Sequence, residues 1–289
     1  MDILEYFAPR TIEEACHLLS KYKEEARVIA GGTDLLVQMK HGDSLPKYII
    51  NITGIPGQDY IDYNDKAGLS IGALATIHSI EVSSLIQEKF NTLAQAARQL
   101  GTAQIRNRAT IAGNLCNAAP SAELAPALIV LGARARIVGT AGERTALIED
   151  FFAGPGQTVL KPDEILTEIQ VPNLLPGSGG VYIKHTIRRA MDLAIVGVGV
   201  MLTVDRSVLN NVRIALGAVA PIPIRARNAE GILAGEKLDD DLLQKAGLIA
   251  SEESSPINDV RSSADYRRKM VKVLVARAIK QAVEQVEAG

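Results

Sequence analysis

The sequence predicts a globular protein of mixed helices and strands that divides into two parts. Of its 289 residues, 47% are hydrophobic and 22% are charged, which is ordinary for a chain with a sizeable buried core. In the first part, short apolar runs typical of strands alternate with amphipathic helical patterns. Pro172 to Gly180 then form a linker by composition, and strand-like runs followed by helical segments come after it. We therefore place a domain boundary near residue 176, between residues 1–175 and 176–289.

Charge and hydropathy exclude several classes of function. The formal net charge is −2 at pH 7, and the interspersed charges form no basic stripe, so nucleic acid is not expected as a partner. Met1 to Glu5 lack the layout of a signal peptide, and the longest apolar run, Leu193 to Val204, is too short to span a bilayer. We expect a cytoplasmic protein without a membrane span.

The first elements lead to a glycine-containing loop. Thr11 and Glu14 form a capping-box signature, and the helix that follows has an apolar face in which Cys16 is expected to be buried. Arg27 to Ala30 is a short buried strand, and Gly31-Gly32-Thr33-Asp34 comes directly after it, before a helical turn. This order leaves backbone N–H groups free where a phosphate could bind. The loop lacks the Rossmann G-x-G-x-x-G spacing and, taken alone, is typical of a plain turn.

The next elements are predicted from periodicity and caps. Tyr48 to Ile52 and Leu69 to Ala73 are strands, and Thr76 or Ser79 can cap a helix near His78, which we interpret as a surface or cap residue. The following helix carries Phe90, Leu93, Ala97 and Leu100 and ends at Gly101. The basic run Arg106-Asn107-Arg108 could complement a pyrophosphate or form a solvated edge, and the sequence leaves both open.

A second small, polar loop extends from Thr110 to Glu123. Its glycine allows close backbone approach, and its Asn, Ser and Thr side chains supply short donors and acceptors. Cys116 in this loop suits packing or ligand contact, and a nucleophilic role is disfavoured because no His is near it in sequence. A buried helix, Leu124 to Leu131, and a strand, Ala133 to Val138, follow. Two such loops can clamp one ligand.

The cysteine count restricts metal chemistry. Cys16 and Cys116 are the two cysteines, and with four His they cannot supply a four-ligand zinc or iron–sulfur site. Any metal cluster is therefore expected on another chain.

The second part is predicted to contain strands and then helices. The strand-like runs are Val181 to Arg188, Leu193 to Val204 and Val212 to Val219, and the helices are Asn228 to Ala234, Asp241 to Ala250 and Tyr266 to Val286. The last helix has an apolar stripe at Met270, Val273, Leu274, Ala278 and Ala282. We interpret the stripe as packing within the chain, with subunit contact as the alternative.

Several segments, in order, resemble the FAD-binding medium subunit of the xanthine dehydrogenase and carbon monoxide dehydrogenase family of molybdenum hydroxylases. The pairing of Val28 to Leu35 with Arg106 to Pro120 is the most specific match. Later matching segments are Ile169 to Pro172, Tyr182 to Lys184, Arg188-Arg189 and Ala264 to Met270. The resemblance covers essentially the whole chain. It implies an α+β protein with a vanillyl-alcohol-oxidase-type (PCMH-like) FAD-binding fold. Two α+β subdomains, about 1–55 and 56–175, would precede a C-terminal domain with an antiparallel sheet and helices.

The resemblance also implies an FAD site without catalytic side chains or metal ligands. The adenosine pyrophosphate would be held on backbone amides of the segment Arg27, Val28, Ile29, Ala30, Gly31, Gly32, Thr33, Asp34 and Leu35. The remaining phosphate, ribityl and ribose contacts would come from Ala109, Thr110, Gly113, Asn114, Cys116, Asn117, Ala122 and Glu123. Leu100 and Leu166 match apolar contacts and Lys184 matches a polar contact near the flavin. Asp192 and Leu193 would cover the isoalloxazine ring, where some relatives have an aromatic residue in place of Leu193.

The activity implied by the resemblance is electron relay by an oxidoreductase subunit. A large subunit would carry molybdopterin and a small subunit two [2Fe–2S] clusters, in a dimer of heterotrimers. FAD on this chain would then reduce NAD⁺, O₂ or another acceptor. A stand-alone FAD-dependent oxidase of the same fold is an alternative, although the sequence offers no convincing base or covalent flavin tether. A non-catalytic assembly module is a further alternative, and both intact glycine loops disfavour it.

Overall fold

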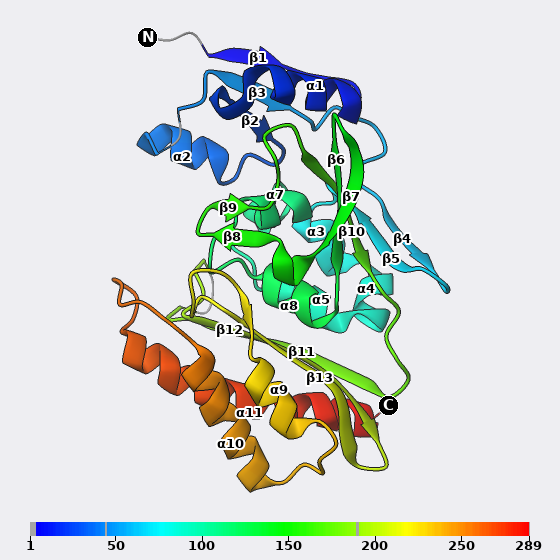
Figure 1. Ribbon diagram of the computed structural model, residues 1–289, viewed down its shortest axis with the longest axis vertical. Coiled ribbons are helices and arrows are strands. Elements are labelled where there is room, and N and C mark those ends of the chain that lie inside the picture. The colour runs from blue at the N-terminus through cyan, green and yellow to red at the C-terminus, as the bar shows by residue number, and fades with distance from the viewer. Residues whose placement is uncertain (1–3, 44, 189–190, 289) are drawn as a thin grey trace.

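The computed structural model describes residues 4–43, 45–188 and 191–288. Met1 to Ile3 and Arg189, which entered the sequence analysis, lie outside these ranges. Figure 1 shows three stacked parts, from the N-terminal strands at one end to a helical layer at the other. None of the helices in the described ranges has the length and apolarity needed to cross a membrane.

The N-terminal part is a small parallel sheet covered by one helix. Its strand order is β1-β3-β2, from β1 (Glu5–Phe7), β2 (Ala26–Ile29) and β3 (Tyr48–Asn51). Helix α1 (Ile12–Tyr22) begins as predicted, because Thr11 Oγ1 accepts a hydrogen bond from the Glu14 N–H at 3.1 Å. Cys16 is 1% exposed in its core, which confirms the predicted burial. Helix α2 (Leu35–His41) follows the first glycine loop.

The central part is an antiparallel sheet with helices packed against it. The strand order is β4-β5-β10-β6-β7, from β4 (Ile61–Asn64), β5 (Gly68–Gly72), β6 (Arg134–Gly139), β7 (Gly142–Leu147) and β10 (Ile165–Val171). The helices are α3 (Ile77–Val82), α4 (Ser84–Lys89), α5 (Asn91–Arg98), α6 (Ala103–Arg106), α7 (Ile111–Cys116) and α8 (Leu124–Val130). A short hairpin, β8 (Phe152–Gly154) and β9 (Gln157–Thr158), lies beside them. Phe90 and Phe151 are among the largest fully buried side chains of this core.

The C-terminal part is a four-stranded antiparallel sheet with helices on one face. The strands, in sheet order, are β11 (Ser178–His185), β12 (Val196–Asp205), β13 (Val208–Gly217) and β14 (Ile224–Arg225). The helices are α9 (Arg227–Leu233), α10 (Asp240–Glu253) and α11 (Ala264–Ala288). Helix α11 packs on β11 and β12, while α5 and α8 of the central part contact the same sheet (Figure 1). The sheet therefore lies between two helical layers.

Several predicted elements require correction. The second loop is not wholly irregular, because Ile111–Cys116 form α7 and bury Ile111 and Leu115 completely. The predicted linker ends early, since β11 already begins at Ser178 and pairs with β12. In the last helix, Val273 is 46% exposed and does not belong to the buried stripe. The stripe consists of Val271, Leu274, Val275, Ala278, Ile279 and Ala282, which pack within the chain.

Candidate functional site

A cavity of about 930 Å³ lies where the two glycine-containing loops meet. Its walls include both loops, Leu100 to Thr102 from the chain before α6, and Ile165-Leu166 from β10. Met191 to Leu193 close it from the C-terminal part. Segments from all three parts of the molecule therefore share one cavity.

The first loop depends on the absence of a side chain at Gly31. A Cβ atom there would lie 1.9 Å from the Arg108 carbonyl oxygen, so glycine lets the first loop touch the chain just before the second loop. Gly32 has a φ of +73°, a backbone conformation that favours glycine. Within the described residues, the backbone N–H groups of Thr33 and Asp34 donate no hydrogen bond, so they remain available to a ligand.

The second loop is held by its own hydroxyl and amide groups. Thr110 Oγ1 accepts from the Gly113 N–H at 3.1 Å and caps α7. Gln38 on α2 donates from Nε2 to Asn117 Oδ1 at 3.0 Å, which joins the two sides of the cavity. The Oδ1 atom of Asn114 is buried and has no hydrogen-bond partner in the described part of the chain. A buried acceptor of this kind is costly unless a ligand or water satisfies it.

Lys184 lies behind the cavity wall rather than in it. Its Nζ donates to Glu123 Oε1 at 2.8 Å, and the two side chains are only 6% and 7% exposed. The same ammonium donates to the carbonyl oxygens of Gln99 at 2.9 Å and Asp192 at 2.7 Å. Burial raises the pKa of Glu123 above its ordinary value, and the charge of Lys184 opposes that rise. Lys184 thereby ties a wall carboxylate to the segment that carries Asp192.

Asp192 shapes the segment that closes the cavity. Its carboxylate accepts hydrogen bonds from the backbone N–H groups of Arg188 at 3.1 Å, Leu193 at 3.0 Å and Ile187 at 3.2 Å. These bonds hold the pKa of Asp192 below its ordinary value although burial opposes them. Leu193 remains 44% exposed at the mouth. The carboxylate thus binds the backbone of its own segment, while Leu193 is an exposed residue of the cavity lining.

The structure also shows the surroundings of Cys116, Arg106 and His78. Burial raises the pKa of the Cys116 thiol to about 12, so it stays protonated at neutral pH and is no nucleophile. Arg106 does not face the cavity, because its guanidinium pairs with Glu81 at 2.7 Å and donates to the Leu100 carbonyl oxygen at 3.1 Å. Neither proposed reading of the basic run holds for it, since its side chain is only 15% exposed. His78 is 44% exposed, as expected of a surface residue.

Every predicted site residue lines the cavity except Lys184. Other lining residues were missed by the sequence analysis, among them Gln38, Ile52, Thr102, Gly156, Leu160 and Ile165. Gln38 follows Asp34 by about one helical turn, a spacing that could have identified it. The described residues contain no group of three or more His, Cys, Asp or Glu placed to hold a metal ion.

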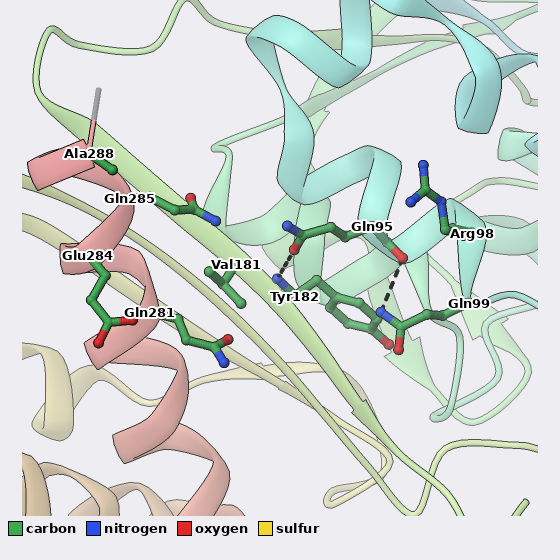
Figure 2. A pocket seen from close by; sticks show the side chains of 9 residues that line it. All are labelled: Gln95, Arg98, Gln99, Val181, Tyr182, Gln281, Glu284, Gln285 and Ala288. Atoms are coloured by element: carbon green, nitrogen blue, oxygen red, sulfur yellow. Dashed lines mark hydrogen bonds between the residues drawn. The ribbon is translucent and has the colours of Figure 1, made fainter. Parts of the chain in front are cut away.

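A second, polar cavity of about 570 Å³ lies between α5, β11 and the end of α11 (Figure 2). Gln95 Oε1 accepts from the Tyr182 N–H at 2.8 Å, and Gln285 Oε1 accepts from the Gly180 N–H at 3.2 Å. Because β11 is an edge strand, backbone N–H groups on its outer side have no neighbouring strand, and the two glutamine side chains accept hydrogen bonds from them. We interpret this cavity as a gap in the interface between the central and C-terminal parts.

Comparisons with known proteins agree with this arrangement. The family model described as "FAD binding domain in molybdopterin dehydrogenase" matches residues 2–174, and "CO dehydrogenase flavoprotein C-terminal domain" matches residues 182–282. Fold and cavity together define a flavin-binding subunit of an oxidoreductase. The chain belongs to the family of FAD-binding medium subunits of the molybdenum hydroxylases.

Relatives and solved structures match over nearly the whole chain. The glyceraldehyde dehydrogenase medium chain of Sulfolobus acidocaldarius is 33% identical, over 96% of this chain and 97% of that one. The carbon monoxide dehydrogenase medium chain of Hydrogenophaga pseudoflava is 32% identical, over 96% of each. A structure of carbon monoxide dehydrogenase from that organism matches with a TM-score of 0.94 at 32% identity, covering 97% of each chain. Quinoline 2-oxidoreductase from Pseudomonas putida 86 matches with a TM-score of 0.91 at 26% identity, covering 98% of each. The predicted FAD-binding fold is thereby confirmed.

The cavity fits the cofactor of this family. FAD presents phosphates, hydroxyl groups and a flat ring, and the cavity offers a matching partner for each. Unused backbone N–H groups at Thr33 and Asp34 suit a phosphate. The unpartnered Asn114 oxygen and the Glu123 carboxylate suit hydroxyl donors, while Leu100 and Leu166 offer apolar surface.

Proposed function

We propose that this chain receives electrons from the [2Fe–2S] clusters of a partner subunit and passes them to NAD⁺, O₂ or another acceptor. The observation that carries the proposal is the convergence of segments from all three parts on one cavity with unused polar groups. FAD supplies the redox chemistry when it is bound, so the protein needs to bind, orient and shield it. This division of labour accounts for a cavity built from backbone, amides and small residues.

Each group of residues is assigned a part in binding. The backbone of Arg27 to Leu35 holds the pyrophosphate, and the Asn114 amide and Glu123 carboxylate orient the sugar and ribityl hydroxyls. Asp192 shapes the covering segment, and Lys184 fixes that segment against Glu123. The exposed Leu193 would leave a bound flavin ring accessible to an acceptor.

The names of the relatives support a proposed assembly with other subunits. They are named medium chains of dehydrogenases, which favours a large molybdopterin subunit and a small iron–sulfur subunit as partners here. We propose a dimer of heterotrimers in the cytoplasm. We further propose that the domain boundary lies near residue 176, in the short connection between Val171 at the end of β10 and Ser178 at the start of β11.

The first test counts the flavin that the chain releases on denaturation, together with the subunits that copurify with it. Near one equivalent of non-covalent FAD, without iron–sulfur absorption from this chain, is expected. Copurified molybdenum and iron–sulfur subunits would support the relay. A flavoprotein that turns over a small alcohol or acid alone would favour the stand-alone oxidase. If the chain is colourless and takes up no added FAD, the non-catalytic assembly module would be the remaining alternative.

Gly113→Val tests the assignment of the second loop. An added Cβ would approach Thr110 Oγ1 at 2.9 Å, and Gly113 itself lines the cavity. We expect the variant to remain folded by circular dichroism and to lose its FAD. Gly54→Val is the control, because a Cβ there meets no heavy atom within 4 Å among the described residues. Equal flavin content in the two variants would contradict the assignment.

A further inference from the structure

A buried arginine lies in the first turn of α11, outside the cavity. Arg267 is 3% exposed, and its Nη1 donates to the carbonyl oxygens of Ile195 at 2.7 Å and Ala218 at 3.0 Å. Its Nη2 donates to Asp259 Oδ1 at 2.8 Å. The Nε atom is buried without a hydrogen-bond partner in the described part of the chain. One guanidinium thus joins three separate segments.

Two of those segments lead directly to the cavity. Ile195 ends the stretch that begins with the lining residues Met191 to Leu193, and its N–H donates to the His185 carbonyl oxygen at 2.8 Å. Ala218 donates from its N–H to the Pro120 carbonyl oxygen at 2.7 Å, within the second loop. Arg267 therefore holds one carbonyl next to each of two cavity walls.

The third segment anchors the guanidinium itself. Asp259 also accepts from the N–H groups of Arg261 at 2.9 Å and Ser262 at 3.0 Å, so its carboxylate is held in place independently of Arg267. Because Asp259 is fixed, the fork of Arg267 is oriented toward Ile195 and Ala218. The ion pair with Asp259 thereby fixes the position of the Arg267 side chain.

The geometry requires an arginine. A guanidinium is planar and spreads its donors in a fixed fork, whereas a lysine ammonium concentrates its donors at one point. Ala218 has a φ of +64°, which is uncommon for a residue with a side chain and persists where the surroundings enforce it. Burying a charged group is costly. The buried guanidinium of Arg267, next to the segments of Ile195 and Ala218, therefore requires an explanation.

We propose that Arg267 is a positioning residue for the FAD cavity, which sets the place of the Met191–Ile195 wall and of the Pro120 turn. The proposal rests on the proposed function only for the identity of the ligand. Arg267 acts through the Ile195 and Ala218 carbonyl groups and does not touch the cavity. Its loss is expected to loosen two walls at once.

The test compares Arg267→Met and Arg267→Lys with Arg268→Met in the full chain. Arg268 is the neighbour on the same helix, is 45% exposed, and makes its ion pair with Asp265 at 3.4 Å. Amide hydrogen exchange is followed at Ile195 and Ala218, with Val204 at the far end of β12 as internal reference. In Arg267→Met we expect exchange at the two sites to be at least about tenfold faster, with Val204 unchanged.

The flavin provides a second readout. Arg267→Met should weaken FAD binding by at least about tenfold and alter the visible circular dichroism of the bound flavin, since the walls around it move. Arg267→Lys should fall between this variant and wild type, and Arg268→Met should match wild type. If Arg267→Met fails to accumulate, Arg267→Lys and Asp259→Asn carry the same comparison.

The outcomes separate the two proposals. Unchanged exchange at Ile195 and Ala218, or acceleration of Val204 by the same factor, would overturn the positioning role. So would FAD binding and circular dichroism equal to wild type despite local loosening. If the wild-type chain takes up no FAD, the proposed function fails, while the exchange data still decide whether Arg267 positions the walls.

Discussion

Asp259 shows how a single carboxylate makes this structure sensitive to acid. Although burial opposes ionisation, the N–H groups of Arg261 and Ser262 and the Arg267 guanidinium hold the pKa of Asp259 at about 2. In the unfolded chain the pKa of an aspartate is about 3.9. Because the folded pKa is the lower one, the stabilisation is complete above about pH 4 and is lost as the pH falls toward 2.

Asp259→Asn should therefore lower the free energy of unfolding at neutral pH and flatten its decline between about pH 4 and pH 2. Urea unfolding at a series of pH values measures both effects. Asp265→Asn is a surface control, since that side chain is 87% exposed. Identical pH profiles for wild type and Asp259→Asn would disprove the linkage.

At single residues, the sequence predicted which residues gather at the cavity better than it predicted which partners their side chains bind. Both glycine loops were identified from composition, and their residues meet at the cavity. Lys184 was expected as a polar contact near the flavin, and in the structure it does not line the cavity, because Glu123 and two carbonyl groups take up all of its ammonium donors. Such a choice between protein and ligand partners depends on distances between segments far apart in sequence. Arg267 lies in the matching segment Ala264 to Met270, but its role could not be predicted for the same reason.

Two glycines in the C-terminal helices provide a comparison at the level of elements. Gly247 in α10 faces α11, where a Cβ would lie 2.3 Å from the Lys272 carbonyl oxygen. Gly231 in α9 faces open space, with no heavy atom within 4 Å of such a Cβ among the described residues. The same substitution should therefore have opposite effects in the two helices.

Gly247→Ala should destabilise the protein by about 1–3 kcal/mol, because the two helices must move apart. Gly231→Ala should stabilise it by about 0.5–1 kcal/mol through helix propensity. Urea denaturation of the two variants beside wild type measures the difference. Stability changes of the same sign would show that α10 and α11 are not packed as described.

Elements with a regular apolar period were predicted well, and those without one were not. The α1 cap and the positions of α8 to α11 followed from periodicity and caps. Helix α7 was not predicted because Gly113 and Asn114 have low helix propensity, although the helix has a buried face. The start of β11 was read as linker because Ser178-Gly179-Gly180 look flexible. Gly179 is small because the backbone of α11 passes there, and a Cβ would lie 2.0 Å from the Ala282 carbonyl oxygen.

At the scale of the whole molecule, the central and C-terminal parts are joined by buried charge as well as by apolar packing. Glu123 precedes α8 and Lys184 lies on β11, so their ion pair crosses between the two parts. A less buried group also joins the two parts, since Glu149 contacts the part-buried Arg225 and the exposed Arg227, each at 3.2 Å. Neither part can shift without separating these charges.

Removing one charge of the Glu123–Lys184 pair should be worse than removing both. Lys184→Met leaves a buried carboxylate unpaired and should cost about 3–5 kcal/mol of unfolding free energy. The double variant Glu123→Gln with Lys184→Met should recover a large share of that loss. A double-mutant cycle by urea denaturation measures the coupling. Simple additivity of the two single variants would show that the pair does not couple the parts.

The glutamines along β11 bear on whether this chain pairs with copies of itself. An exposed edge strand offers its unpaired amides as a template for another chain, which is a common start of aggregation. Here the outward N–H groups of Gly180 and Tyr182 are already occupied by Gln285 and Gln95. A newly made chain is therefore protected at this edge from joining its sheet to that of another copy.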